Sequence, residues 1–204
     1  DELGGKLALV NSDAANREEL EAAINKLRDD VLKSANHISK QREAVIPKFE
    51  QQVSGLLKKV GMENAMFQIR LTLTQDGEPT GNGVDDICFL FTANKGSEPA
   101  DLRKAASGGE LSRLMLCIKS LVAGSMAFPT LIFDEIDTGI SGEVANKVGE
   151  ILNSLSKNHQ VISVTHLPQI AAKGASHLFV YKRDDAGQTA TNLKSLQGDE
   201  RVVE

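Results

Sequence analysis

Long apolar runs are missing from this sequence of 204 residues. No segment reaches the roughly 18 consecutive apolar residues that a membrane-spanning helix requires. The first residues also lack the basic and apolar regions of a secretory signal peptide. These absences argue against a membrane protein or an exported protein, and we expect the chain to be cytoplasmic.

Basic residues are in deficit. Lysine and arginine number 23 against 28 aspartates and glutamates, which gives a net charge of −5. A surface that wraps nucleic acid by bulk electrostatics needs clustered basic residues in excess, so any such contact must be local. Four residues are weak candidates for it, and a solvated surface is the favoured interpretation of each: Lys58, Lys59, Arg103 and Lys104.

Cysteine is scarce as well. Cys88 and Cys117 lie in apolar segments, and neither belongs to a Cys-x-x-Cys pair or lies near a histidine cluster. Such a pattern is typical of buried, reduced thiols and not of a disulfide framework or a zinc site.

Two motifs of nucleotide and acyl-transfer chemistry are absent. The phosphate-binding P-loop pattern G-x-x-x-x-G-K-[ST] does not occur, and the Gly5-Lys6 pair is followed by Leu7. The serine elbow G-x-S-x-G is missing too, because residues 139–142 have the wrong spacing. The chain by itself therefore lacks the usual cradle for a nucleoside triphosphate.

What is present begins with a long polar helix. Asn11, Ser12 and Asp13 are good N-cap residues, and the apolar positions that follow are four, three, four and seven residues apart: Leu20, Ile24, Leu27, Val31 and Ile38. This narrow heptad seam favours a coiled-coil stem over a globular surface helix. Because the chain opens at Asp1 close to this helix, we expect it to be a piece of a longer polypeptide.

A second amphipathic stretch and two strands come next. Pro47 should interrupt or kink the stem, after which apolar residues continue at helical spacing to Gly61, a predicted C-cap. Alternating patterns at residues 67–73 and 87–92 predict two antiparallel strands joined by a turn. Residues 94–106 read as a polar loop.

The remainder predicts a parallel strand pair. Residues 130–133 and 161–164 are short apolar runs of the kind buried in parallel sheets, and an amphipathic helix separates them. In such a βαβ unit, the residues that follow the two strands emerge at one edge of the sheet. Two further strands are expected at residues 177–182 and 190–196.

The segment Ser107-Gly108-Gly109-Glu110 opens a helix and permits two interpretations. Ser107 and Glu110 match a capping box, but this does not account for two glycines in the first turn, which cost up to about 1 kcal/mol each relative to alanine. A helix N-terminus without side chains in the way is also a good phosphate-binding surface. The apolar face of the helix is predicted to contain Leu111, Leu114, Met115, Ile118, Leu121 and Val122.

Acidic residues follow the first strand of the parallel pair, and a histidine follows the second. Asp134 is placed to orient a Mg²⁺ ion, and Glu135 to polarise a water that attacks a phosphate. His166 could contact the phosphate or the attacking water. A pair of solvated acids and a structural histidine remain open as alternatives, and only the structural interpretation is given to His37, His159 and His177.

The triplet Asp137-Thr138-Gly139 also matches aspartic proteases. That chemistry needs a second carboxylate that shares a proton with the first, and the chain contains no second triplet. We therefore favour a turn between a strand and a helix at this position.

Together these motifs resemble a known family. Residues 106–113 resemble the signature motif of ABC-type ATPases, residues 130–135 resemble Walker B, Asp137 falls at the D-loop and His166 falls at the switch histidine. The amino-acid sequences of residues 107–113, 133–142 and 164–171 are similar to those of the RecN family of bacterial SMC-like DNA repair ATPases. The similarity is dense from about residue 100 to 183. Ala106 departs from the leucine of many ABC proteins, which weakens a transporter interpretation more than a RecN-like one.

The resemblance implies an α/β fold: the C-terminal lobe of an ABC/SMC-type ATPase head, with a mostly parallel sheet flanked by helices and a long N-terminal coiled-coil stem helix. The implied division is residues 1–46 for the stem and 47–204 for the lobe. The Walker A lobe would lie near the N-terminus of the same full-length chain, across an antiparallel coiled coil.

The resemblance also implies roles for single residues. Asp134 would hold Mg²⁺, Glu135 would be the catalytic base, and His166 would contact the γ-phosphate or the water. The signature residues Ser107, Gly108, Gly109 and Glu110 would bind ATP held by an opposing head, with Ser107 and Gly109 at its γ-phosphate. Asp137 would lie at the interface of the two heads.

The implied function is ATP hydrolysis between two dimerised heads in DNA double-strand break repair and recombination, in the nucleoid of a bacterial cytoplasm. The cofactors would be ATP and Mg²⁺. The partners would be the Walker A lobe, a second head and, through the full-length protein, DNA, with no membrane. This chain alone would be inactive. Two alternatives stay open: a non-catalytic scaffold for head dimerisation, and the ATPase subunit of another ABC branch.

Overall fold

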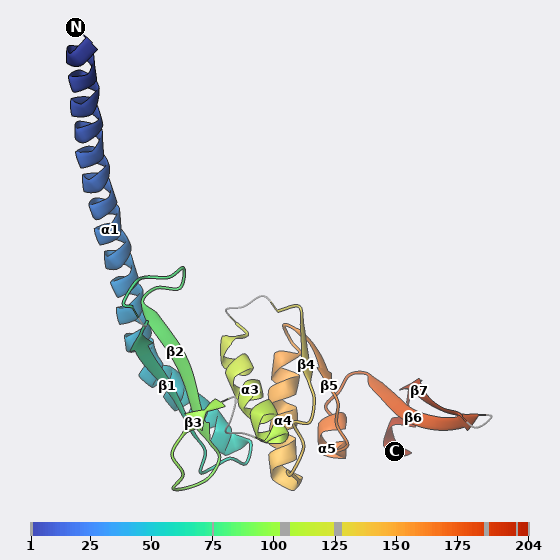
Figure 1. Ribbon diagram of the computed structural model, residues 1–204. Coiled ribbons are helices and arrows are strands. Elements are labelled where there is room, and N and C mark those ends of the chain that lie inside the picture. Colours follow the sequence, from blue (N-terminus) through green and yellow to red (C-terminus); the bar gives the residue numbers. More distant parts are fainter. Residues whose placement is uncertain are drawn as a thin grey trace. The chain divides into compact units, whose positions relative to one another are not determined.

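The structure is a computed structural model that describes residues 2–74, 76–102, 107–124, 128–185, 188–198 and 200–203. Figure 1 labels its helices and strands along the chain. These elements divide into two compact units. The stem unit comprises Asp1–Glu50 and Gln68–Phe89, and the lobe unit comprises Gln51–Phe67 and Leu90–Glu204. The sequence-based boundary between residues 46 and 47 stays a prediction. Arg103, Lys104 and Ala106 lie outside the described residues.

The helix α1 spans Glu2–Lys59 and corrects two predictions. It does not begin at the cap residues 11–13, because helix-favouring residues such as Leu7 and Ala8 precede them and carry the helix upstream. The helix also continues through Pro47, so of the predicted interruption or kink the interruption is wrong. The proline removes one backbone hydrogen bond, but Val53 and Leu57 are fully buried in the following turns, and their packing stabilises the helix. Gly61, at φ +78°, follows the helix end as predicted.

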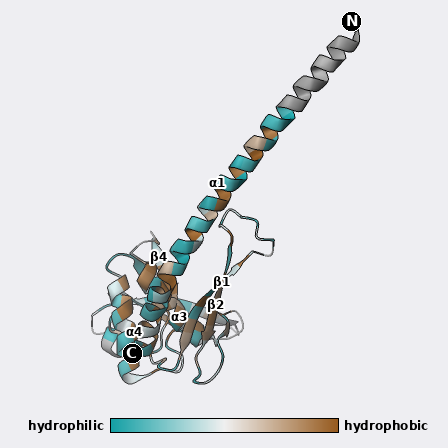
Figure 2. Ribbon diagram, turned by 90° about the vertical axis from the view of Figure 1, so that its left-hand side faces the viewer, coloured by the Kyte–Doolittle hydropathy of each residue, from teal (hydrophilic) through white to brown (hydrophobic). Residues whose placement is uncertain are grey.

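The predicted heptad seam lies on the surface of α1. Its five apolar residues are between 39% and 64% exposed: Leu20, Ile24, Leu27, Val31 and Ile38. Figure 2 shows hydrophobic and hydrophilic stretches interspersed along the described part of the helix. The ion pairs of this region are exposed helical pairs, such as Arg17 with Glu21. An apolar stripe that stays in solvent is what a coiled-coil partner would cover.

The strands β1 (Met66–Leu73), β2 (Asp85–Thr92) and β3 (Ala100–Asp101) form one sheet in that order. The pairing of β1 with β2 agrees with the prediction. The short β3 was missed, since residues 94–106 read as a loop. It pairs antiparallel with β2, where Leu90 lies opposite Asp101.

Within the stem unit, a buried aspartate joins α1 to β2. The carboxylate of Asp85 accepts a 2.5 Å hydrogen bond from the Ser39 hydroxyl and a 2.9 Å hydrogen bond from Arg42 Nη1. The hydrogen bond from Ser39 and the charge of Arg42 hold the pKa of Asp85 below its ordinary value, against the effect of burial. The second guanidinium nitrogen of Arg42 donates to the Asn82 carbonyl at 2.8 Å.

The predicted βαβ unit forms in the lobe unit. The strands β4 (Thr130–Phe133) and β5 (Gln160–Ser163) are parallel, and the helix α4 (Gly142–Leu155) connects them. Phe133 lies opposite Ser163, so Asp134 and Val164 follow at the same edge. The short helix α5 (Pro168–Ala171) packs against α4 at Gly149, where an added Cβ would lie 3.4 Å from the Gln169 carbonyl oxygen.

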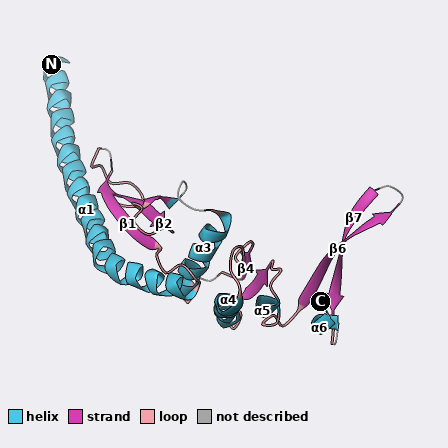
Figure 3. Cartoon of the chain, turned by 90° about the horizontal axis from the view of Figure 1, so that it is seen from below, coloured by secondary structure: helices cyan, strands magenta, loops and turns pink. Residues whose placement is uncertain are grey.

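The predicted mostly parallel sheet is only partly present. Among the described strands, β4 and β5 form the parallel pair that the structure contains, whereas β6 (His177–Asp185) and β7 (Gln188–Leu196) form an antiparallel hairpin. Figure 3 shows this hairpin as a two-stranded ribbon. Only two residues separate β6 from β7 in the sequence, so they cannot be parallel neighbours, which need a crossover. The short helix α6 (Glu200–Val203) follows.

The helix α3 (Gly108–Val122) has a wider buried face than the apolar face predicted for it. Of the six predicted residues, Leu114 is fully buried and the other five are half-buried: Leu111, Met115, Ile118, Leu121 and Val122. The prediction missed the buried Leu116 and Cys117, and it left out Gly109 and Arg113 because they are not apolar. Cys117 is fully buried, and burial raises the pKa of its thiol to about 12. Cys88 is half-buried.

None of the helices in the described ranges is long and apolar enough to cross a membrane.

Candidate functional site

The N-terminus of α3 carries the predicted capping box. The Ser107 hydroxyl accepts a 3.4 Å hydrogen bond from the Glu110 backbone N–H, and the Glu110 carboxylate accepts a 3.0 Å hydrogen bond from the Ser107 backbone N–H. Ser107 and Gly108 are exposed, so the first turn of this helix of 15 residues is open to solvent. Its N–H groups and the helix dipole favour an anion there.

The two glycines of this turn are explained by a close approach within the lobe unit. A Cβ added to Gly108 would lie 2.8 Å from the Glu135 carboxylate. A Cβ added to Gly109 would lie 3.0 Å from Thr138 Cβ and 3.3 Å from the Glu135 carbonyl oxygen. The loop after β4 therefore packs directly on the start of α3. The signature segment and the acidic segment, 25 positions apart as Gly109 and Asp134, meet in one place.

Arg113 ties the same loop to α3, and the sequence analysis did not single it out. Its side chain is buried, and Nη1 donates a 2.6 Å hydrogen bond to the Thr138 carbonyl. Burial lowers the pKa of this guanidinium, and the charge of Glu110 partly opposes that effect. Its position four residues after Gly109, one helical turn away, was the available signal.

Glu135 has an unusual backbone. Its φ of +57° makes it the one non-glycine residue with positive φ in the described part of the chain. The left-handed region costs an ordinary residue roughly 1–2 kcal/mol. Such a conformation is held in place by its surroundings and is concentrated at functional sites. Here the packing of the loop on Gly108 and Gly109 is the surrounding that holds it.

Asp137 is buried beneath the site and faces the loop that follows β5. Its Oδ2 accepts a 2.5 Å hydrogen bond from the Thr165 hydroxyl and a 2.9 Å hydrogen bond from the His166 backbone N–H. The same oxygen lies 3.1 Å from His166 Nδ1. Burial alone would raise the pKa of Asp137, but these hydrogen bonds and the histidine lower it overall.

His166 presents the rest of its side chain to solvent, with 73% exposed, whereas the Asp137 side chain is 4% exposed. Thr165, which also escaped the sequence analysis, links the two, because its hydroxyl donates to Asp137 and accepts from the Leu167 backbone N–H at 3.1 Å. Its position beside His166 was the only sequence signal. The loop after β4 and the loop after β5 were predicted to lie together, and the contact between them is made by Asp137.

Asp134 lies exposed directly after β4, beside the exposed Glu135. Within the described residues, no group of three or more acidic, histidine or cysteine side chains could hold a metal by itself. This donor set fits Mg²⁺, because that ion is usually bound by one or two carboxylates and takes its other ligands from water and substrate phosphates.

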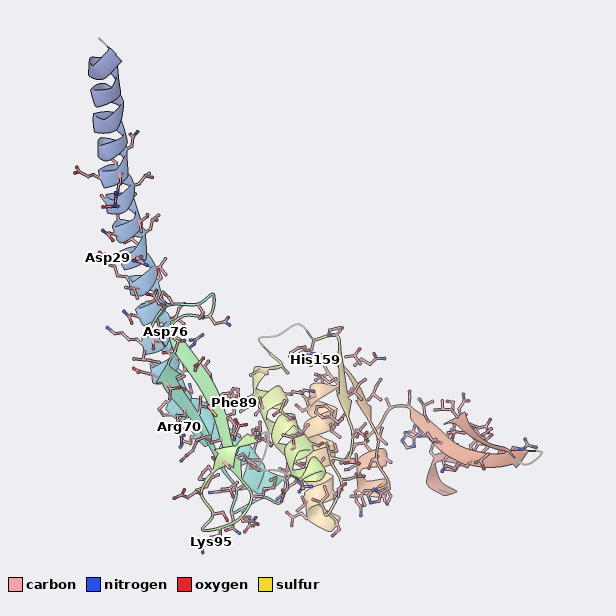
Figure 4. The ribbon with its side chains drawn as sticks, in the orientation of Figure 1. Asp29, Arg70, Asp76, Phe89, Lys95 and His159 are labelled. Atoms are coloured by element: carbon pink, nitrogen blue, oxygen red, sulfur yellow. The ribbon has the colours of Figure 1, made fainter. Side chains whose placement is uncertain are left out.

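The other three histidines make local contacts, in keeping with their structural interpretation. His159, which Figure 4 labels, places Nδ1 2.7 Å from the Phe128 carbonyl oxygen. His177 lies 2.9 Å from the Arg201 guanidinium, and His37 lies 3.1 Å from the Gln41 amide on α1.

Known proteins resemble this chain over nearly its whole length. The chain is 40% identical over 199 residues to the DNA repair protein RecN of Rickettsia conorii, a match that covers 98% of this chain and 36% of that protein. It is 39% identical over 193 residues to RecN of Treponema pallidum, covering 93% of this chain and 34% of that protein. The chain thus spans about a third of the length of these relatives. No protein-family model matches it.

Solved structures show the same fold. The Smc head domain of Pyrococcus yayanosii, with a coiled coil and joint, matches 93% of this chain and 34% of that chain with a TM-score of 0.60 and 20% identity. The Smc head domain of Pyrococcus furiosus, bound to the C-terminal domain of ScpA, matches 89% of this chain and 43% of that chain with a TM-score of 0.55 and 19% identity. The chain has the fold of an SMC head domain and belongs to the RecN family of DNA repair proteins, of which it is the C-terminal part.

Proposed function

We propose that this chain is the catalytic C-terminal lobe of an SMC-like ATPase head, which hydrolyses ATP between two dimerised heads once it is joined to its Walker A lobe. The proposed setting is DNA double-strand break repair and recombination, in the nucleoid of the bacterial cytoplasm. The names of the RecN relatives support a role in DNA repair. The full-length protein would contact DNA through parts that include residues beyond this chain.

The observation that carries the proposal is the approach of Glu135 to the start of α3. A Cβ on Gly108 would lie 2.8 Å from the carboxylate, so the acidic loop and the start of α3, which would serve different nucleotides in the dimer, are held together in one lobe. In the proposed reaction Glu135 takes a proton from the attacking water as general base. His166, exposed on the neighbouring loop, would hydrogen-bond a γ-phosphate oxygen or the water.

Asp134 would hold Mg²⁺, which supplies charge neutralisation for the phosphates when it is bound. The exposed turn at Ser107 and Gly108 would contact the γ-phosphate of ATP held by the opposing head. Gly109 is buried under Thr138, so it would contribute through its backbone alone. The buried carboxylate of Asp137 would contribute from within its own lobe and not as a surface group of the dimer interface.

An exposed apolar face on the parallel pair supports the proposed Walker A partner. Ile132 and Ile162 lie opposite each other on β4 and β5 and are 62% and 44% exposed, and Val164 on the same side is 58% exposed. The Thr130 hydroxyl donates to the Gln160 side chain at 2.8 Å on this face. Parallel strands are normally covered on both faces. We infer that the Walker A lobe of the full-length chain covers this one.

The test is steady-state ATP hydrolysis by the full-length protein with Glu135→Gln. Loss of the general base should lower turnover by about 10²- to 10⁴-fold. ATP binding should persist, so closed head dimers should accumulate and be detectable by light scattering or crosslinking.

Glu143→Gln is the matched control, because Glu143 is an exposed acid on α4 that pairs with Lys147 at 2.8 Å. Unchanged turnover in Glu135→Gln would remove Glu135 from its role. If wild-type protein binds ATP and dimerises but never hydrolyses it, the scaffold alternative would replace the enzyme.

A further inference from the structure

The contacts of Asp137 carry an inference that rests on the proposed function and deepens it. Three groups approach its Oδ2 atom: the Thr165 hydroxyl at 2.5 Å, the His166 backbone N–H at 2.9 Å and His166 Nδ1 at 3.1 Å. The three come from two consecutive residues of one loop. A single buried carboxylate oxygen therefore fixes both the backbone and the ring of His166.

The surroundings make this carboxylate an intramolecular anchor. Its side chain is 4% exposed, so its surface is occupied by its own chain. The neighbouring Ile136 is fully buried and holds the loop after β4 in the core of the lobe unit. The Thr165 hydroxyl extends the network to the Leu167 backbone N–H, just before α5 begins at Pro168. The loop that bears His166 is thus held by hydrogen bonds at three successive residues, Thr165, His166 and Leu167.

We propose that Asp137 is the positioning residue for His166 and holds its ring with Nδ1 toward the lobe and Nε2 toward the ATP site. The ring nitrogen that faces a carboxylate carries a proton, and this contact sets the tautomer and the orientation of the ring. Nε2 is then the nitrogen presented to solvent, on a side chain that is 73% exposed. Asp137 acts through His166 and does not itself touch the nucleotide.

A purely structural role for Asp137 makes a different prediction. If the carboxylate only closed the loop through Thr165 and the backbone N–H, the chemical state of the His166 ring would be independent of it. The cost of losing Asp137 would then be the same whether or not residue 166 is a histidine. A double-mutant cycle separates the two roles, because residues that act as a unit show non-additive effects.

The experiment measures single-turnover ATP hydrolysis by the full-length protein with Asp137→Asn, His166→Gln and both changes. Carboxylates that orient metal-bound histidines are worth about 10- to 100-fold, and we expect Asp137→Asn to lower the rate about 10-fold by the same logic. In the His166→Gln background the same change should cost less than about 2-fold. Glu143→Gln, an acid-to-amide change at an exposed residue, should leave the rate unchanged.

A second measurement does not depend on activity. Nitrogen-15 NMR of the histidine rings in the full-length protein reports the tautomer of His166, identified by the signal missing from His166→Gln. We expect the proton on Nδ1 in wild-type protein and a mixture of tautomers in Asp137→Asn, because a neutral amide makes a weaker hydrogen bond than a carboxylate.

The outcomes separate this inference from the proposed function. Equal losses of rate in both backgrounds, or a wild-type ring with its proton on Nε2, would overturn the positioning role. The wild-type spectrum decides this even if Asp137→Asn does not fold. If His166→Gln hydrolyses ATP at the wild-type rate, the proposed role of His166 in hydrolysis fails, and the tautomer alone decides whether Asp137 orients the ring.

Discussion

The stem part of α1 and the helix α3 use the same kind of amphipathic pattern in opposite ways. On α1, Leu20 and Leu27 are each 64% exposed, whereas Leu114 and Leu116 on α3 are fully buried. The arginines of the two helices show the same difference. Arg17 of α1 pairs with Glu21 at the surface, whereas Arg113 of α3 is buried and donates to the Thr138 carbonyl. Helical periodicity therefore identifies an apolar face, but the partner that covers it can belong to another part of a longer protein.

Truncating one leucine on each helix gives the largest contrast. Leu114→Ala should lower the free energy of unfolding by about 2–5 kcal/mol, because it removes a fully buried side chain and leaves a cavity. Leu27→Ala should change it by less than about 0.5 kcal/mol in this isolated chain, since the side chain is 64% exposed. Urea denaturation followed by circular dichroism measures both. A comparable loss in Leu27→Ala would mean that the seam is already covered in solution.

Removing one carboxylate from each region extends the contrast to charge. Asp137→Asn should cost about 1.5–3 kcal/mol near neutral pH, because it weakens hydrogen bonds to a buried charged group. Asp30→Asn on α1 should cost almost nothing, since Asp30 pairs with Lys33 at 3.6 Å on the surface.

The pH dependence of that loss has a definite sign. The pKa of Asp137 is lowered in the folded protein from 3.8, so its contribution to stability is present above pH 3.8 and is lost as the pH falls through the folded pKa. Unfolding measured from about pH 7 to about pH 2 should show wild type and Asp137→Asn converging below pH 3.8. A gap that stays constant would show that charge on Asp137 is not what stabilises the fold.

Glycine replacements give the smallest and sharpest contrast, because the two helices predict opposite signs. Gly109→Ala should destabilise the chain by about 1 kcal/mol, since the new methyl group would meet Thr138 Cβ at 3.0 Å and the Glu135 carbonyl oxygen at 3.3 Å. Gly55→Ala, at a position of α1 with no atom within 4 Å of the added Cβ, should stabilise it by about 0.5–1 kcal/mol. Thermal unfolding measures both, and stabilisation by Gly109→Ala would contradict the close packing.

Local patterns were enough to predict much of the lobe. The apolar runs on either side of α4 predicted the parallel pair, and Ser107 with Glu110 predicted the capping box. The burial of Arg113 and the contacts of Asp137 could not be predicted, because each depends on a partner 25 or more residues away, Thr138 or Thr165. The antiparallel pairing of β6 with β7 was not predicted, because a mostly parallel sheet was expected.

The extension of α1 to Glu2, the first described residue, shows the opposite failure. Asn11, Ser12 and Asp13 have the local chemistry of an N-cap, but an N-cap residue begins a helix only when the residues before it are not helical. Likewise, Pro47 removes a single hydrogen bond from a helix that buries Val53 and Leu57 farther along. Local stop signals are overridden wherever the flanking turns are stabilised independently.

The burial of Cys117 gives the chain a built-in reporter of motion. A thiol reacts as its thiolate, and burial raises the pKa of this one to about 12 within a fully buried side chain of α3. A thiol-specific reagent can therefore modify Cys117 only when α3 opens transiently, and the modification rate measures the free energy of that opening. Followed with and without nucleotide in the full-length protein, this one sulfur atom would report how firmly α3 is held in each state.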